Sequence, residues 1–252
     1  RTRGTVAVHD LSLRIRKKEC FWLLGTNGAG KTTTLQMIMK QVPLISGTIN
    51  INGKSINAFS DERFDGVGFC PQTNALLPNH TTKEMLMFYS RIRGVPKEEI
   101  KEYVGQWMHL TRLTRFENTR CKQLSGGNKR KLSLTIAIIG NPTLAVLDEP
   151  SAGVDPAARK KLHRVINAVK LKGTTIILTT HHMGEAAKMG DRIGIMVQGR
   201  LGCVGTSGHL LSKYAEGYAC TVSMIRGKNV EDKVLPLLRD MCPDLIVANH
   251  PN

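Results

Sequence analysis

Residues 25–32 read Gly25-Thr26-Asn27-Gly28-Ala29-Gly30-Lys31-Thr32, and this stretch decides the fold. It matches the phosphate-loop pattern G-x-x-x-x-G-K-[ST] at every fixed position. The apolar run before it, residues 20–24, predicts a buried strand, and residues 33–39 predict a helix. Glycines let the main chain turn its N–H groups towards an anion, and the start of the helix adds its positive dipole end. The sequence therefore predicts a strand–loop–helix unit that binds phosphate.

Two side chains of this stretch have specific chemical roles. Lys31 supplies a positive charge for the β- and γ-phosphates of a nucleotide, and the hydroxyl of Thr32 is placed for Mg²⁺. The alternative is a glycine-rich turn that merely precedes a lysine. The motifs downstream make this alternative the weaker interpretation.

The second motif, residues 144–149, is an apolar strand that ends in Asp148 and Glu149. At the carboxyl end of the sheet Asp148 lies beside the phosphate loop, where it can hold the shell of Mg²⁺. Glu149, one residue further on, can polarise a water in line with the γ-phosphate. A solvent-facing acidic pair at a strand end is the alternative, which the phosphate loop upstream disfavours.

The third motif, residues 124–128, places Ser125 before Gly126 and Gly127, with Asn128 next. Two glycines after a serine let the phosphate of another molecule approach main-chain N–H groups. The helix that we expect from residue 129 directs its positive end at that phosphate. A simple helix cap by Ser125 would explain the same residues locally.

Composition limits the remaining possibilities. The chain has 252 residues, 41% of them hydrophobic, and no run of 18 apolar residues that would predict a transmembrane helix. Its start lacks both an initiator Met and the apolar core of a signal peptide, so we expect a piece of a longer chain. The 6 cysteines are scattered without a C-x-x-C pair, which favours reduced thiols over disulfides or a zinc site.

The net charge of +16 has three explanations. We favour a nucleotide together with an anionic membrane surface; solvated faces without a partner and a nucleic acid are the alternatives. Aromatic residues make up only 5% of the chain, and no interleaving with basic residues predicts a base-stacking surface.

Short strands alternate with helices along the chain. Apolar runs typical of strands buried on both faces occur at residues 67–69, 144–147, 174–179 and 193–197. Asn52-Gly53 predicts a hairpin turn after residues 48–51, and residues 198–200 a turn between two late strands. Between residues 81 and 139 the pattern is helical, with a capping box at residues 81–84 and a second helix expected from Pro96 through Met108. The predicted fold class is α/β: a P-loop NTPase core with a mostly parallel sheet, an antiparallel β edge subdomain and a helical insertion.

Together these motifs resemble the nucleotide-binding domain of an ATP-binding cassette (ABC) transporter, over roughly residues 6–215. Three further matches occur in the family order: Gln72 in the Q-loop, residues 151–155 as the D-loop, and His181 as the switch histidine. Residues 70–77 and 126–133 resemble subfamily A, the lipid transporters. Within that subfamily the run Asn-Lys-Arg-Lys from residue 128 resembles the second cassette of a full-length chain.

The resemblance implies ATP and Mg²⁺ as the bound cofactors and assigns a role to each matching residue. Phosphate binding is implied for Gly25, Thr26, Asn27, Gly28, Ala29, Gly30, Lys31, Thr32 and Thr33. Residues implied to complete the nucleotide site of an opposite cassette are Ser125, Gly126, Gly127, Asn128 and Asp155. Contacts to Mg²⁺ are implied for Thr32, Gln72 and Asp148, and catalytic roles for Glu149 as base, His181 as γ-phosphate sensor and Gln72 at the attacking water. His182 is the competitor for the switch role, and Asp155 has a second interpretation as the N-cap before Pro156.

The expected organisation follows from the same resemblance. Residues 1–216 are expected to form the cassette, with a helical subdomain at about 76–140, and residues 217–252 to begin a truncated regulatory domain. The expected partners are a second cassette and transmembrane domains at the cytosolic face of a membrane. An anionic membrane surface is a further candidate partner, and no specific nucleic acid is expected. The alternative function is a soluble ABC ATPase that acts on nucleic acid or the ribosome. A cassette that binds without hydrolysis is disfavoured because Glu149 and His181 are both present.

Three features depart from the family pattern or stay open. Asn128 stands where most of the family has Gln. Residues 1–20 contain no Phe, Trp or Tyr to stack on adenine, so we expect that aromatic before Arg1. The basic triplet, residues 129–131, is interpreted as a solvated face; support of the opposite nucleotide or of anionic lipid is the alternative.

Overall fold

The computed structural model describes residues 6–56, 66–215 and 240. The chain divides into two units, Arg1–Tyr214 and Ala215–Asn252. The structure expected for residues 217–252 lies outside the described residues, apart from Asp240. The domain boundaries expected from the sequence therefore stay predictions.

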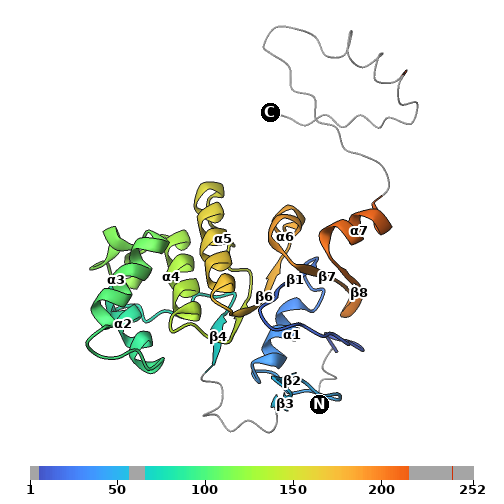
Figure 1. The fold of residues 1–252 in the computed structure, drawn as a ribbon, viewed down its shortest axis with the longest axis horizontal. Helices are drawn as coiled ribbons and strands as arrows, with labels where there is room; N and C mark the ends of the chain where they lie inside the picture. Colours follow the sequence, from blue (N-terminus) through green and yellow to red (C-terminus); the bar gives the residue numbers. More distant parts are fainter. Residues whose placement is uncertain (1–5, 57–65, 216–239, 241–252) are drawn as a thin grey trace. The chain divides into compact units, whose positions relative to one another are not determined.

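The central layer of the first unit is a six-stranded sheet with the order β4-β5-β6-β1-β7-β8 (Figure 1). Neighbouring strands are parallel except β7 and β8, which form an antiparallel edge. The strands are β1 (Cys20–Gly25), β4 (Val67–Cys70), β5 (Leu144–Leu147), β6 (Thr175–Thr180), β7 (Arg192–Val197) and β8 (Arg200–Gly205). The mostly parallel sheet is confirmed, and the carboxyl ends of its parallel strands share one edge.

Apolar layers bury both faces of the parallel part of the sheet, which is why strands such as β1, β5 and β6 are apolar runs rather than alternating ones. On one face, Trp22 and Leu178 pack in a core with the helices α2 (Thr82–Ile92), α3 (Ile100–Thr111), α4 (Gly126–Ile138), α5 (Pro156–Leu171) and α6 (Met183–Met189). On the other face, Phe21 and Val146 pack against Leu35 of α1 (Lys31–Ile38). Both faces carry a full hydrophobic core, so the sheet is a firm base for the loops at its edge.

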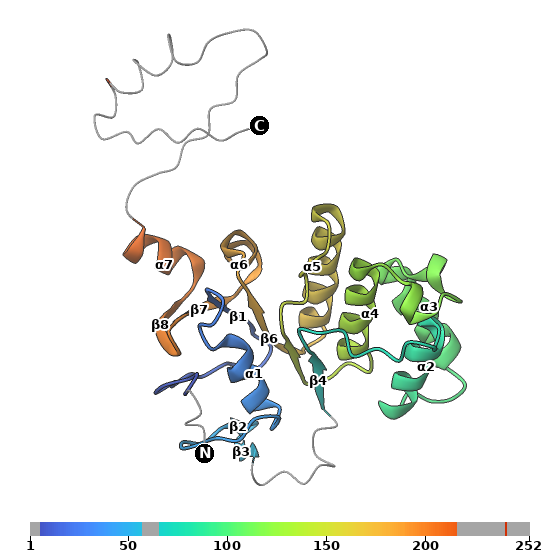
Figure 2. The same ribbon diagram turned by 180° about the vertical axis from the view of Figure 1, so that it is seen from behind.

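The predicted helical insertion is present between β4 and β5. It contains α2, α3, α4 and the 3₁₀ turns Thr114–Phe116 and Cys121–Gln123, and α2, α3 and α4 lie side by side in both views (Figures 1 and 2). The capping box is confirmed: Thr81 Oγ1 accepts from the Glu84 N–H (3.2 Å), and the Glu84 carboxylate accepts from the Thr81 N–H (2.8 Å). The expected helix from Pro96 to Met108 begins later, at Ile100, because Pro96 opens a turn that the Glu99 N–H closes (3.0 Å).

The predicted hairpin is also present, as the two-stranded sheet of β2 (Asn50–Ile51) and β3 (Lys54–Ser55). Asn52 (φ 52°) and Gly53 (φ 79°) both adopt the left-handed conformation that a two-residue hairpin loop needs. The short helix α7 (Ser207–Tyr214) follows β8. In the described part of the chain, no helix is long and apolar enough to cross a membrane.

Four of the six cysteines lie among the described residues. Cys20, Cys70, Cys121 and Cys203 are free thiols, and the remaining two cysteines lie outside the described residues. Burial raises the pKa of Cys20 to about 11, so this thiol is protonated at neutral pH.

Candidate functional site

The phosphate loop connects β1 to α1 at the carboxyl edge of the sheet. Gly28 and Gly30 have φ values of 81° and 99°, and a Cβ at Gly30 would lie 2.7 Å from the Ala7 carbonyl oxygen. Only glycine fits there, so the loop can bring its N–H groups close to an anion. No side chain caps the start of α1. Lys31 is buried, and its Nζ donates to the carbonyls of Gly25 (2.8 Å) and Thr26 (3.0 Å).

Two carboxylates follow β5 at the same edge. Asp148 is buried and its Oδ1 accepts a hydrogen bond from Thr179 Oγ1 at 2.5 Å. Glu149 has a left-handed main chain (φ 45°), and its N–H donates to the same Thr179 hydroxyl at 2.9 Å. A glutamate in this conformation is uncommon and marks local strain of the kind found at functional sites. Thr179 thus holds both acidic residues, a role that the sequence did not reveal.

The structure brings His181, rather than His182, to the acidic pair. His181 Nδ1 lies 3.3 Å from Glu149 Oε1, and the His181 side chain is 47% exposed while that of Glu149 is 12% exposed. The two histidine rings pack against each other with their centroids 4.1 Å apart. The structure thus places His181 against Glu149, and its role at the γ-phosphate stays a prediction.

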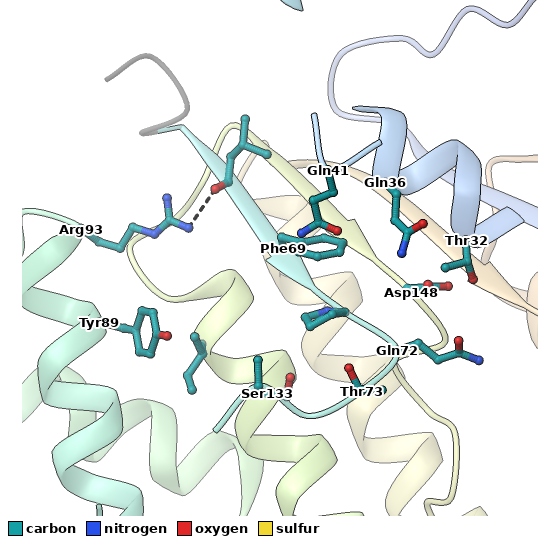
Figure 3. A pocket seen from close by; sticks show the side chains of 14 residues that line it. Thr32, Gln36, Gln41, Phe69, Gln72, Thr73, Tyr89, Arg93, Ser133 and Asp148 are labelled. Atoms are coloured by element: carbon teal, nitrogen blue, oxygen red, sulfur yellow. Dashed lines mark hydrogen bonds between the residues drawn. The ribbon is translucent and has the colours of Figure 1, made fainter. Parts of the chain in front are cut away.

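A hollow of about 550 Å³ joins the residues expected at the metal (Figure 3). Thr32 from α1, Gln72 from the loop after β4 and Asp148 from the end of β5 all border it. Its other side is formed by the helical insertion, where Tyr89 and Ser133 line the wall. Residues that are far apart in the sequence therefore bring three oxygen-bearing side chains to one space.

The Ser125–Asn128 group lies elsewhere and does not border this hollow. Ser125 caps α4, and its Oγ accepts from the Asn128 N–H at 3.4 Å. A Cβ at Gly127 would lie 3.7 Å from the Gly153 carbonyl oxygen, so this group adjoins the loop that leads to Asp155. Asp155 is the N-cap of α5: its Oδ1 accepts from the Ala158 N–H (2.9 Å), a bond that lowers the pKa of the carboxyl. The expected site residues thus form two separate groups on one chain.

The interpretation of residues 129–131 as a solvated face is wrong for Arg130. Its side chain is only 2% exposed and donates to main-chain carbonyls of the loops that carry Gln72 and Glu149. Lys131 is half-buried and donates to Asn128 Oδ1 at 3.1 Å. The sequence pattern failed here because helix position decides burial: Arg130 lies on the face of α4 that packs against the sheet.

A second hollow of about 560 Å³ lies between α3, α4 and α5 and is basic. Cationic side chains lining it include Arg112, Arg115, Lys131 and Lys161, with Asp155 as the carboxylate at its wall. Burial lowers the pKa of Lys131, Asp155 raises it, and the neighbouring cations lower it further. Positive charge is therefore concentrated beside the Ser125–Asn128 group.

One further cluster went unrecognised in the sequence. Glu185 of α6 accepts hydrogen bonds from Ser151 (3.2 Å), Arg159 (3.0 Å) and His163 (3.0 Å). It joins the helix after His181 to α5 and to the loop after Glu149. No charge pattern in the sequence indicated it, because Glu185 lies 22 to 34 positions along the chain from its three partners.

Comparison with known proteins identifies the family. Residues 8–152 match the family model described as ABC transporter. The chain belongs to the ABC transporter family. Its fold is that of the family's ATP-binding cassettes, and the sequence resemblance to the family is confirmed.

Individual relatives agree with this assignment. The human retinal-specific phospholipid-transporting ATPase ABCA4 is 42% identical over 230 residues, which are 91% of this chain and 10% of that protein. A solved ATP-binding subunit of an ABC transporter is 28% identical, with a TM-score of 0.76 over 82% of this chain and 87% of its own. A solved dimeric cassette of a bacterial ABC transporter shares the fold at 23% identity, with a TM-score of 0.73 over 80% of this chain and 90% of its own.

Members of subfamily A are among these relatives, so the expected resemblance to that subfamily is confirmed. The chain spans about a tenth of the length of that human relative. These comparisons do not favour the alternative of a soluble ABC ATPase on nucleic acid.

Proposed function

We propose that the cassette binds ATP with Mg²⁺ and hydrolyses it to drive transport of lipids. The observation that carries this proposal is the convergence of Thr32, Gln72 and Asp148 on one hollow beside the phosphate loop. Family membership and the phospholipid-transporting relative support it further.

The residues present fit Mg²⁺. This ion takes oxygen ligands and is commonly held by one or two carboxylates together with substrate phosphates. Thr32, Gln72 and Asp148 offer a hydroxyl, an amide and a carboxylate at one hollow, and Thr179 orients the carboxylate. When bound, the ion would neutralise charge on the β- and γ-phosphates. Among the described residues no three His, Cys, Asp or Glu side chains gather as a metal cage, which fits an ion held partly by a nucleotide.

Glu149 is the proposed general base. Its side chain is 12% exposed, it follows the strand that carries Asp148, and its left-handed main chain turns it away from the line of β5. His181 lies 3.3 Å from its carboxylate and can orient it or carry the charge change at the γ-phosphate. Lys31, now bound to the loop carbonyls, would exchange these partners for phosphate oxygens.

Hydrolysis is proposed to need two cassettes paired head-to-tail. The Ser125–Asn128 group does not border the hollow at the phosphate loop of its own chain, yet it presents a helix start suited to an anion. In the paired arrangement this group would complete the site of the opposite cassette. The dimeric bacterial cassette with the same fold supports this arrangement.

The membrane setting is a proposal of the same kind. As a cassette of a lipid transporter, the chain would work at the cytosolic face of a membrane beside transmembrane domains. Its net charge of +16 suits an anionic membrane surface. Salt-sensitive binding to phosphatidylserine vesicles, with no sequence preference among nucleic acids, is expected; tight sequence-selective binding of DNA or RNA would favour the alternative function.

The phosphate loop is tested by Lys31→Ala, which should abolish ATP binding because it removes the charge beside the phosphates. The matched control is Lys101→Ala, an exposed lysine of α3, which should bind ATP as the wild type does. Isothermal titration of ATP measures both variants. Normal affinity in Lys31→Ala would refute the phosphate-loop assignment.

The catalytic assignment is tested by Glu149→Gln. This variant should bind ATP but not hydrolyse it, since the base and the binding groups are distinct, and it should accumulate an ATP-bound dimer. Phosphate release and size-exclusion chromatography with ATP provide the measurements, with the exposed Glu98→Gln as control. A variant that stays monomeric with ATP, or hydrolyses it at the wild-type rate, contradicts the assignment.

A further inference from the structure

Arg130 is a buried cation whose hydrogen-bond partners are all main-chain carbonyls. The side chain is 2% exposed. Its Nη1 donates to Pro71 (2.6 Å) and Gln72 (3.2 Å), its Nε donates to Glu149 (3.1 Å), and its Nη2 donates to Asp148. The planar guanidinium carries five N–H donors in a fixed fork, which lets one side chain satisfy several carbonyls at once.

These four carbonyls belong to two different loops. Pro71 and Gln72 follow β4, whereas Asp148 and Glu149 follow β5, the neighbouring strand. The Asp148 N–H donates to the Cys70 carbonyl at 2.8 Å, so the two loops separate just beyond this point. Arg130 therefore lies at the branch between the loop that carries Gln72 and the pair that carries the carboxylates.

The helix that carries Arg130 is fixed against the sheet. A Cβ at Gly68 of β4 would lie 1.7 Å from the Ala137 carbonyl oxygen, so the helix and the strand meet at main-chain contact. Between these points Ser133 Oγ lies 3.5 Å from Cys70 Sγ. Positions 130, 133 and 137 share one face of a helix. This face of α4 therefore contacts β4 and the loops beyond it along its length, with the Arg130 guanidinium at one end.

Burial alone does not explain an arginine at this position. A buried charge often stabilises a fold less than an apolar side chain of similar volume would. What the guanidinium adds is geometry, because its fork imposes fixed distances between the four carbonyls. A residue that fixes main-chain distances next to Gln72 and Glu149 acts on the groups that must line up for hydrolysis.

We propose that Arg130 is a positioning residue of the reaction. It sets the spacing between the Gln72 loop and the Asp148–Glu149 pair, and it ties both to the helix that Ser125 caps. This inference rests on the proposed function. Ser125 is proposed to serve the nucleotide site of the opposite cassette. Because Ser125 and Arg130 lie on the same helix, Arg130 also connects the nucleotide site of its own chain to the Ser125–Asn128 group.

The first test is Arg130→Lys, which keeps the charge but loses the fork, so a single Nζ cannot span four carbonyls. Turnover of ATP should fall by about tenfold or more, because small misplacements of reacting groups have large kinetic effects. The affinity for MgATP should stay within about twofold, since Lys31 and its loop are untouched. The matched control is Arg164→Lys, at an exposed position of α5, which should change neither quantity.

A double-mutant cycle with Gln72→Ala separates positioning from a general loss of activity. If Arg130 acts through the Gln72 loop, the combined variant loses less turnover than the product of the two single losses. Single losses that multiply, or an Arg130→Lys defect confined to ATP affinity, overturn the proposal. The proposed function would fail differently: Lys31→Ala would still bind ATP, or Glu149→Gln would still hydrolyse it.

The wild-type protein gives an independent test if Arg130→Lys does not fold. In protein labelled with ¹⁵N-arginine, the Arg130 Nε signal should shift when MgATP binds, because the nucleotide changes the charge beside the Gln72 and Glu149 loops whose carbonyls Arg130 contacts. The Arg164 signal should stay unchanged. An Arg130 signal that does not respond to MgATP overturns the proposal.

Discussion

A single threonine organises both acidic residues of the candidate site. The Thr179 hydroxyl donates to Asp148 Oδ1 and accepts from the Glu149 N–H, so its one proton and one lone pair serve two neighbours. Thr179 is fully buried at the end of β6, next to the strand that carries the pair. The positions of the Asp148 carboxylate and of the Glu149 main chain therefore depend on a neutral side chain from another strand.

Thr179→Val should separate these contributions, because valine keeps the shape and removes the hydroxyl. Loss of the two hydrogen bonds should lower the free energy of unfolding by about 1–3 kcal/mol and also reduce ATP turnover. The control is Thr174→Val, another buried threonine, whose Oγ1 donates to the Pro142 carbonyl at 2.8 Å. Denaturant unfolding and phosphate release should show similar destabilisation in both variants but lost turnover only in Thr179→Val; unchanged turnover there would contradict the role.

At this scale the sequence identified charged residues in a phosphate-loop context but not the residues that orient them. Lys31, Asp148 and Glu149 were predictable because glycines or an apolar strand precede them. Thr179 was not, since threonine is common in any strand. Arg130 was misinterpreted because its two lysine neighbours mask a burial that depends on the packing of α4.

Among the elements, α5 and α6 are joined by a group that responds to pH. Burial lowers the pKa of His163 from its usual 6.5, and the Glu185 carboxylate raises it only in part; Arg159 adds to the lowering. Below pH 6.5 the unfolded chain thus binds a proton that the folded chain resists. The contribution of His163 to the free energy of unfolding is therefore fully present above pH 6.5 and is lost as pH falls towards the lower pKa of the folded state.

His163→Gln should reduce this loss, because glutamine keeps an N–H donor for Glu185 without a titrating ring. Melting temperatures measured from neutral to mildly acidic pH should fall less steeply in the variant than in the wild type. His109→Gln, at an exposed position of α3, is the control and should follow the wild type. Parallel curves for His163→Gln and the wild type would show that this histidine does not carry the effect.

The contact between α4 and β4 gives a second prediction for the elements. Gly68→Ala places a methyl group against the Ala137 carbonyl and should lower the free energy of unfolding by about 1–3 kcal/mol. Gly105→Ala, in α3 with nothing within 4 Å of the added Cβ, should instead raise it by about 0.5–1 kcal/mol. Urea denaturation measures both. Equal effects of the two substitutions would mean that α4 is not held tightly at Gly68.

The sequence predicted helix and strand ends well where they depend on hydrogen bonds between neighbouring residues. The capping box and the Asn52-Gly53 hairpin depend on a few adjacent residues, and both are present. The start of α3 was displaced because Pro96 favoured a turn over a first helical residue. The close approach of Gly68 to Ala137 of α4 joins residues that are distant in the sequence and left no local signal.

For the whole molecule, the choice of nucleotide base is a testable expectation. Residues 1–20 contain no Phe, Trp or Tyr, and a stacked aromatic contributes on the order of 1 kcal/mol, or several-fold in affinity. This chain should therefore bind ATP and GTP with affinities within about threefold, since the phosphates provide most of the binding. Competition titrations with ATP, GTP and tripolyphosphate measure this. A strong preference for ATP would mean that other side chains, such as Val8, hold the base.

The main-chain contact between Gly68 and Ala137 also limits which helices of the insertion can move relative to the sheet. The Ala137 carbonyl lies against Gly68 of β4, and the Arg130 guanidinium donates to the loop after β5. These contacts fix α4 to the sheet. If the helical insertion rotates against the core, α2 and α3 would therefore move while α4 stays fixed to the sheet. The segment expected as one subdomain, at about 76–140, would then divide at Ser125 into two parts. One part, with α2 and α3, would move, and the other part, α4, would stay with the sheet.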